Sequence, residues 1–226
     1  IFAVVMAIYG LVVMSLFVPE AGEGMGLMAE SIPELFAAFG MGDMGTTLLE
    51  FINSYLYGMV LTLFPAIYIM ILANRLLARY IANGSMAYLL AAPVTRKQIA
   101  ISQVVFMIVS LLLMFAFSIA LILGTSEIMF PGELEIRPFM YINIGLLGLW
   151  FLLAGICFLV SAGICDAGKV NGINAGIIIY SYLIQSVSRI SEQVEWLTYI
   201  TPFSLFDQTG LIEGKSEAWI TCAVLY

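Results

Sequence analysis

The sequence contains no histidine, and only 10% of its 226 residues are charged. The absence of histidine excludes a Ser-His-Asp triad, most zinc sites and acid–base chemistry based on imidazole. The Walker A pattern, GxxxxGK followed by Ser or Thr, is also missing, so the chain lacks this motif for holding ATP. We therefore expect no catalytic, cofactor or metal site in this chain, and we do not expect it to be an enzyme.

Cysteine and basic residues are also scarce. The three cysteines, Cys157, Cys165 and Cys222, stand far apart and without CxxC spacing, which predicts buried packing residues. Eight Lys and Arg against fifteen Asp and Glu give a net charge of -7. A protein that binds nucleic acid needs a basic surface to neutralise phosphates, so this balance argues against such a partner.

Apolar residues are abundant instead, at 62% of the chain. They form six long runs, which predict membrane-spanning helices because a helix needs about 20 residues to cross the hydrocarbon layer. We expect an all-α integral membrane protein with one domain over residues 1–226, cut inside a helix at both ends. The six predicted helices cover roughly residues 1–18, 55–73, 99–123, 139–163, 170–187 and 218 onward.

Two residue types should shape these helices. Pro65 is expected to kink the second one, because proline removes a backbone donor and crowds the carbonyl four residues earlier. Glycines in and beside the fourth and fifth helices are expected to allow close helix packing. They are Gly145, Gly148, Gly155, Gly163, Gly172 and Gly176.

The distribution of charge predicts the orientation. The 74–98 and 163–169 loops hold five basic residues and one acid, and Lys and Arg favour the cytosolic side. Both loops, and both chain ends, are therefore expected in the cytosol. On the outer side, residues 31–39 and 188–203 show helical spacing of apolar side chains, which predicts amphipathic helices at the interface before the sixth helix.

The cytosolic segment between the second and third helices is the most informative. Asn83 and Gly84 should end the second helix, and Ser85 can cap a short helix that ends before Pro93. Thr95 and Gln98 match a capping box that opens the third helix. The short helix would present apolar side chains to a groove on a soluble partner, namely Met86, Tyr88, Leu89 and Leu90.

This segment, NGSMAYLLAAPVTRKQIAISQ, resembles the coupling-helix segment of ABC-2-type ABC transporter permeases. That family shows Gly-Thr/Ser-x-Glu, a Leu-Leu pair and then Ser/Ala-Pro-Val-Ser/Thr-Arg. The run ITPFSLFDQTGLI at residues 200–212 resembles the outer segment before their last helix. Ala87 departs from the pattern, where many members have Glu. The matching positions are Gly84, Ser85, Leu89, Leu90, Ala92, Pro93, Val94, Thr95 and Arg96.

The resemblance implies a permease subunit of an ATP-driven exporter in the bacterial plasma membrane. A separate nucleotide-binding subunit would hydrolyse ATP with Mg²⁺, and a second permease copy would complete the pathway. The cargo would be amphipathic or hydrophobic, such as a peptide, drug or lipid-like molecule. The residues expected to couple the chain to the ATPase are Gly84, Ser85, Met86, Tyr88, Leu89, Leu90, Pro93, Thr95, Arg96 and Lys97.

Two other functions fit the same sequence. The chain can be a membrane anchor or sensor that docks a soluble partner without transport, or a secondary transporter driven by an ion gradient. Arg75 and Arg79 either contact the ATPase or act only as cytosolic anchors. Polar residues in the helices either join neighbouring helices or line a substrate path, and these are Asn143, Asn171, Asn174 and Gln185.

Overall fold

The computed structural model describes residues 2–17, 47–84, 95–190, 201–213 and 215–225. Within these ranges the regular secondary structure is entirely helical, which confirms the predicted fold class. Three helices are long and apolar enough to cross a membrane: Leu48–Ala82, Lys97–Met129 and Ile136–Gly163. Over their described residues, the other three predicted spans do not meet this length and composition standard, so six spans remain a prediction.

The helix at Leu48–Ala82 is a composite of five pieces. It contains α4 (Leu48–Ile52), the π-helix η1 (Asn53–Val60), α5 (Leu61–Ala73), the π-helix η2 (Asn74–Ala78) and α6 (Arg79–Ala82). It begins earlier than the predicted residue 55 because Thr47 and Glu50 form a capping box. The Glu50 N–H donates to Thr47 Oγ1, and the Thr47 N–H donates to the Glu50 carboxylate.

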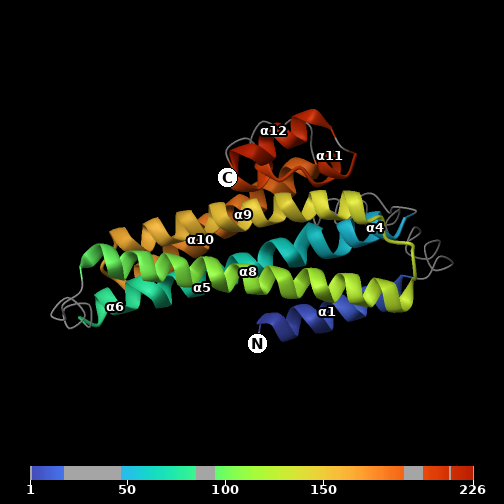
Figure 1. The fold of residues 1–226 in the computed structure, drawn as a ribbon. Coiled ribbons are helices and arrows are strands. Elements are labelled where there is room, and N and C mark those ends of the chain that lie inside the picture. The colour runs from blue at the N-terminus through green and yellow to red at the C-terminus, as the bar shows by residue number, and fades with distance from the viewer. Residues whose placement is uncertain (1, 18–46, 85–94, 191–200, 214, 226) are drawn as a thin grey trace.

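Four further helices lie side by side with the composite helix and run in roughly the same direction as its long axis (Figure 1). They are α1 (Phe2–Leu16), α8 (Arg96–Met129), α9 (Ile136–Gly163) and α10 (Ala167–Ile190). α5 contacts α1, α9 and α10, and α8 packs against α1 and α9. The composite helix is therefore the centre of the bundle, and Pro65 lies within its α5 portion.

A smaller unit follows α10 in the chain. It comprises the 3-10 helix η4 (Pro202–Leu205), α11 (Gln208–Glu213) and α12 (Ser216–Val224), and it packs on the side of α9 (Figure 1). The amphipathic helices predicted at residues 31–39 and 188–203 fall largely outside the described residues. Of the second one, the structure describes the end of α10 and the start of η4.

The helices differ in how much of their surface the protein covers. In the most apolar window of each span, 61% of the composite helix is buried, against 50% for α9 and 28% for α8. α8 exposes large apolar side chains along its length, including Ile101, Phe106 and Leu113. Such a surface suits contact with lipid, because hydrocarbon tails do not penalise exposed apolar groups.

Two packing predictions need correction. Cys157 and Cys222 are buried as expected, but Cys165 is exposed because it lies in the turn between α9 and α10. Of the glycines expected at helix contacts, Gly145 lies against Leu211 and Phe206. Four others have no neighbouring atom within 4 Å of the place of a Cβ: Gly155, Gly163, Gly172 and Gly176.

Candidate functional site

The predicted cytosolic segment is bounded by two defined helix ends. α6 stops at Ala82, and Gly84 takes a left-handed backbone conformation, with φ 69°, that ends the helix. α8 opens with Thr95, whose Oγ1 accepts from the Gln98 N–H at 3.3 Å. Gln98 Oε1 accepts from the Thr95 N–H at 2.8 Å. The predicted helix break and the predicted capping box are both confirmed.

Most of the candidate coupling residues lie between those two ends. The structure describes Gly84, Thr95 and Lys97, all of them exposed, and it describes the backbone of Arg96 at the start of α8. The other candidates lie outside the described residues, so the short coupling helix stays a prediction. They are Ser85, Met86, Tyr88, Leu89, Leu90 and Pro93.

The end of the bundle that carries these boundaries is basic. α6, the start of α8 and the start of α10 lie at the same end (Figure 1), and α6 contacts α10. Arg75, Arg79, Lys97 and Lys169 come from these elements and the adjoining η2, and all four are exposed. The fold thus gathers cations from three separate stretches of the sequence at one end of the bundle, and we call the exposed surface of this end the basic face.

The turn before α10 is fixed to the composite helix. Asp166 accepts from the backbone N–H groups of Gly168 at 2.9 Å and Lys169 at 3.2 Å, which caps the start of α10. Asn74 of η2 donates through Nδ2 to the Ala167 carbonyl at 3.2 Å. A direct hydrogen bond therefore joins the composite helix to the start of α10 at this end of the bundle.

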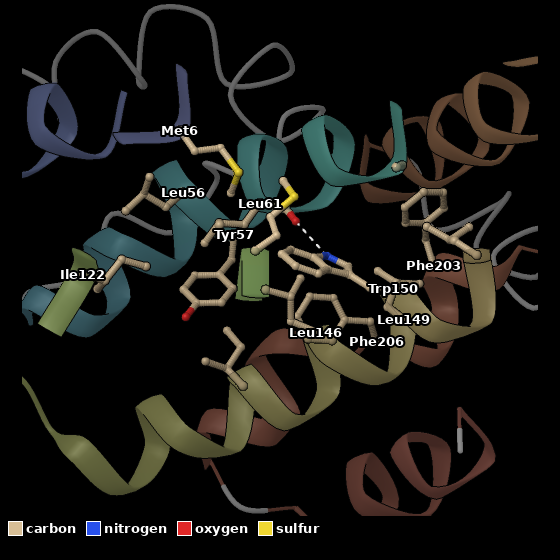
Figure 2. Packing of buried hydrophobic residues seen from close by; sticks show 14 of the residues in the cluster. Met6, Leu56, Tyr57, Leu61, Ile122, Leu146, Leu149, Trp150, Phe203 and Phe206 are labelled. Atoms are coloured by element: carbon tan, nitrogen blue, oxygen red, sulfur yellow. Dashed lines mark hydrogen bonds between the residues drawn. The ribbon is translucent and has the colours of Figure 1, made fainter. Parts of the chain in front are cut away.

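Deeper in the bundle, Pro65 leaves the Leu61 carbonyl without a helical donor, because proline has no N–H for the residue four positions earlier. The indole N–H of Trp150 on α9 fills this role, at 3.1 Å (Figure 2). Trp150 is fully buried, and its ring packs edge-on against Phe115 of α8. Three helices therefore meet at this tryptophan.

A second carbonyl is released at the end of η1. The Leu61 N–H donates to the Leu56 carbonyl, five residues earlier, so it does not serve the Tyr57 carbonyl as it would in an α-helix. Thr62 Oγ1 donates to the Tyr57 carbonyl at 2.6 Å, and Gln208 Nε2 of α11 donates to it at 3.3 Å. The π-helix is thus tied to the small C-terminal unit.

The polar residues predicted inside helices have different surroundings. Asn174 is fully buried and donates to the Cys157 carbonyl of α9 at 3.5 Å, which is an interhelical contact. Asn143 is also buried, but it donates to the Phe139 carbonyl of its own helix at 2.7 Å. The Tyr57 hydroxyl lies close to the Asn143 side chain. Asn171 is exposed and Gln185 is half-buried.

A small cavity of about 10 Å³ lies between α1, η1 and α8. Its lining is apolar apart from Ser118 and includes Met6, Leu56 and Phe117. The Ser118 hydroxyl already donates to the Met114 carbonyl of its own helix. A volume of this size holds about one water molecule, so this arrangement leaves no room there for a cargo molecule.

Sequence reasoning missed the polar contacts that organise the centre of the bundle. The position of Pro65 was enough to indicate an unpaired carbonyl at Leu61. No local sequence feature marks Trp150 as the donor to that carbonyl, and none marks Gln208 as the donor to the Tyr57 carbonyl. In the part of the chain that the structure describes, no group of three or more His, Cys, Asp or Glu residues is placed to hold a metal ion.

Comparisons with known proteins give no relative: no family model, no curated protein and no solved structure matches this chain. The fold and the contacts described above are therefore the basis for any functional inference. In the residues that the structure describes, they establish an all-helical fold, three helices long and apolar enough to cross a membrane, and exposed basic residues at one end.

Proposed function

We propose that this chain is the membrane-spanning permease subunit of an ABC-type exporter, driven by ATP hydrolysis in a separate subunit. Residues 84–97 receive the movement of that ATPase, and the bundle moves an amphipathic or hydrophobic cargo across the bilayer. A second permease copy completes the pathway. In this proposal α1, α10 and α12 join the three long helices to give six spans, and the basic face lies in the cytosol.

The main support is the way the segment at residues 85–94 is mounted. Gly84 ends one long apolar helix and the capping box of Thr95 and Gln98 begins another, so both attachment points are regular helix ends. The adjoining face exposes Arg75, Arg79 and Lys169. A short segment held between two rigid helices transmits force better than a free loop, which suits coupling to a soluble motor.

The interior of the bundle gives further support. Its buried polar side chains, among the described residues, are Ser, Thr, Asn and Gln rather than charged groups. An ion-coupled transporter normally uses ionisable groups within the membrane, so this interior favours a transporter driven from outside. An uncharged interior also suits a cargo that is largely apolar.

The test begins by asking whether a neighbouring reading frame encodes a soluble ATPase, and then reconstitutes that ATPase with the chain in lipid vesicles. We expect candidate cargo to stimulate ATP hydrolysis, and Leu89→Asp or Leu90→Asp to abolish that stimulation, because a charge disrupts an apolar contact with the motor. Ile128→Asp is the matched control, since Ile128 is 83% exposed near the opposite end of α8.

Three outcomes separate the alternatives. Binding of the ATPase without any cargo-dependent stimulation would indicate an anchor or sensor. Uptake driven by an ion gradient in vesicles lacking the ATPase would indicate a secondary transporter. Stimulation that survives both leucine substitutions would show that residues 84–97 are not the coupling segment.

A further inference from the structure

The composite helix Leu48–Ala82 contains two stretches in which backbone hydrogen bonds reach back five residues instead of four. The Leu61 N–H donates to the Leu56 carbonyl at the end of η1, and the Arg79 N–H donates to the Asn74 carbonyl at the end of η2. Each π-helical turn holds more residues than an α-helical turn. α5, with 13 residues, is therefore a regular helix bounded at both ends by a shift of register.

Unsatisfied polar atoms gather in these two stretches. In η1, Asn53 Oδ1 and the hydroxyls of Tyr55 and Tyr57 are buried without a hydrogen-bond partner, and in η2 the same is true of Asn74 Oδ1. Buried polar groups are normally paired, since leaving them unpaired is unfavourable. The arrangement in this structure therefore does not satisfy the π-helical residues fully.

The side-chain contacts on the Tyr57 carbonyl are exchangeable. The carbonyls of Tyr57 and Leu61 are satisfied by the side chains of Thr62, Gln208 and Trp150 rather than by the helix backbone. When η1 becomes α-helical, Thr62 and Gln208 can release the Tyr57 carbonyl to the Leu61 backbone N–H. The Leu61 carbonyl has no such replacement, because Pro65 lacks an N–H. π-helical turns inside α-helices are often found at functional sites.

We propose that α5 is a sliding segment: one surplus residue passes from η1 to η2, and the residues of α5 advance by one position while α4 and α6 stay in place. One position corresponds to a rotation of about 100° and a rise of about 1.5 Å. The movement is a property of the helix and does not depend on the proposed function. In an exporter it would carry a displacement from the basic end of the bundle to the opposite half.

The contact between Tyr68 of α5 and Ser110 of α8 reports the register. Their hydroxyls form a hydrogen bond in this structure. When the surplus residue leaves η1, the residues of α5 advance by one place, and Ile67 takes the position of Tyr68 opposite Ser110. Movement in this direction does not bring Ile69 to Ser110, so Ile69 is the control position.

The test uses pairs of cysteines in a chain whose Cys157, Cys165 and Cys222 are replaced by serine. The hydrogen bond runs through the long tyrosine side chain, so the backbones at positions 68 and 110 are farther apart than a disulfide can bridge. A short bifunctional thiol reagent is therefore applied to membranes containing the protein. We expect cross-links for Tyr68→Cys with Ser110→Cys and for Ile67→Cys with Ser110→Cys, and none for Ile69→Cys with Ser110→Cys.

Deleting Ser54 decides between movement and simple proximity. The deletion removes the surplus residue of η1 and leaves the register of α5 unchanged. We expect the cross-link between cysteines at positions 67 and 110 (the 67/110 cross-link) to be lost. The cross-link between positions 68 and 110 (the 68/110 cross-link) should persist. A 67/110 cross-link that is absent from the full-length chain, or that survives the deletion, overturns the proposal.

If the deletion prevents folding, the 68/110 cross-link will be lost as well. A second variant covers that case. The double substitution Thr62→Val and Gln208→Leu removes both side-chain donors from the Tyr57 carbonyl without shortening the chain. Because these donors hold the register seen here, we expect the 67/110 cross-link to increase relative to the 68/110 cross-link. An unchanged ratio contradicts a sliding segment.

Discussion

The indole N–H of Trp150 on α9 donates a hydrogen bond to the backbone carbonyl of Leu61, at 3.1 Å, on the neighbouring composite helix. Pro65 creates the need for this bond, because it has no N–H to offer the residue four positions earlier. The bond is buried, and it joins residues 89 positions apart in the sequence. Substitution of Trp150, or of the Pro65 that leaves the carbonyl unpaired, should therefore change the free energy of unfolding measurably.

We expect Trp150→Phe to destabilise the protein by about 1–3 kcal/mol from the unpaired Leu61 carbonyl alone, with a further loss from the smaller ring. The measurement is reversible unfolding of the purified protein in detergent. In the Pro65→Ala background the backbone N–H gained at position 65 can serve the Leu61 carbonyl, so the same tryptophan substitution should be milder by roughly 1 kcal/mol. Strictly additive effects would show that the carbonyl does not link the two residues.

The Tyr57 carbonyl accepts from Thr62 and from Gln208, so each donor protects it against loss of the other. We expect Thr62→Val or Gln208→Leu alone to cost about 0.5–1 kcal/mol, because one donor remains. Together they should cost more than the sum, since the buried carbonyl is then unpaired. A double-mutant cycle in the same unfolding assay measures this difference, and a coupling of zero would refute the shared role.

Gly145 lies where α9 meets the small C-terminal unit. A Cβ on this residue would be 2.6 Å from Leu211 Cδ1 and 3.0 Å from the Phe206 ring. We expect Gly145→Ala to destabilise by about 1–3 kcal/mol, because the packed side chains must move apart. Gly155→Ala is the matched control on the same helix, with no atom within 4 Å of the added Cβ, and it should leave stability unchanged or slightly higher. Equal effects of the two substitutions would disprove the close contact.

Local features of the bundle followed well from the sequence. Apolar runs predicted the long helices, and the positions of Gly84, Thr95 and Gln98 predicted where one helix ends and the next begins. These predictions succeeded because helix boundaries depend on backbone conformation and on side chains within four residues. Cys165 shows the limit of that approach, since its exposure depends on the turn between α9 and α10.

The candidate site was predicted only in part. Arg75, Arg79 and Lys97 were expected near the coupling segment from their positions in the chain. The charge distribution also predicted Lys169 on the same side, and the fold places the start of α10 at that end of the bundle. The link from Asn74 to the Ala167 carbonyl joins residues 93 positions apart and has no local signature. The composite nature of Leu48–Ala82 was likewise not predictable, because its apolar composition suits an α-helix and a π-helix equally.

The sequence by itself determined the all-helical class, the helix end at Gly84 and the helix start at Thr95, and the basic character of one end of the bundle. These properties depend on hydrophobicity, capping and charge, which act over one or two helical turns. Only the tertiary structure decided that Tyr57 and Leu61 present free carbonyls to Gln208 and Trp150. Gln208 is 151 positions from Tyr57, and such a partner is chosen by the packing of whole helices in space.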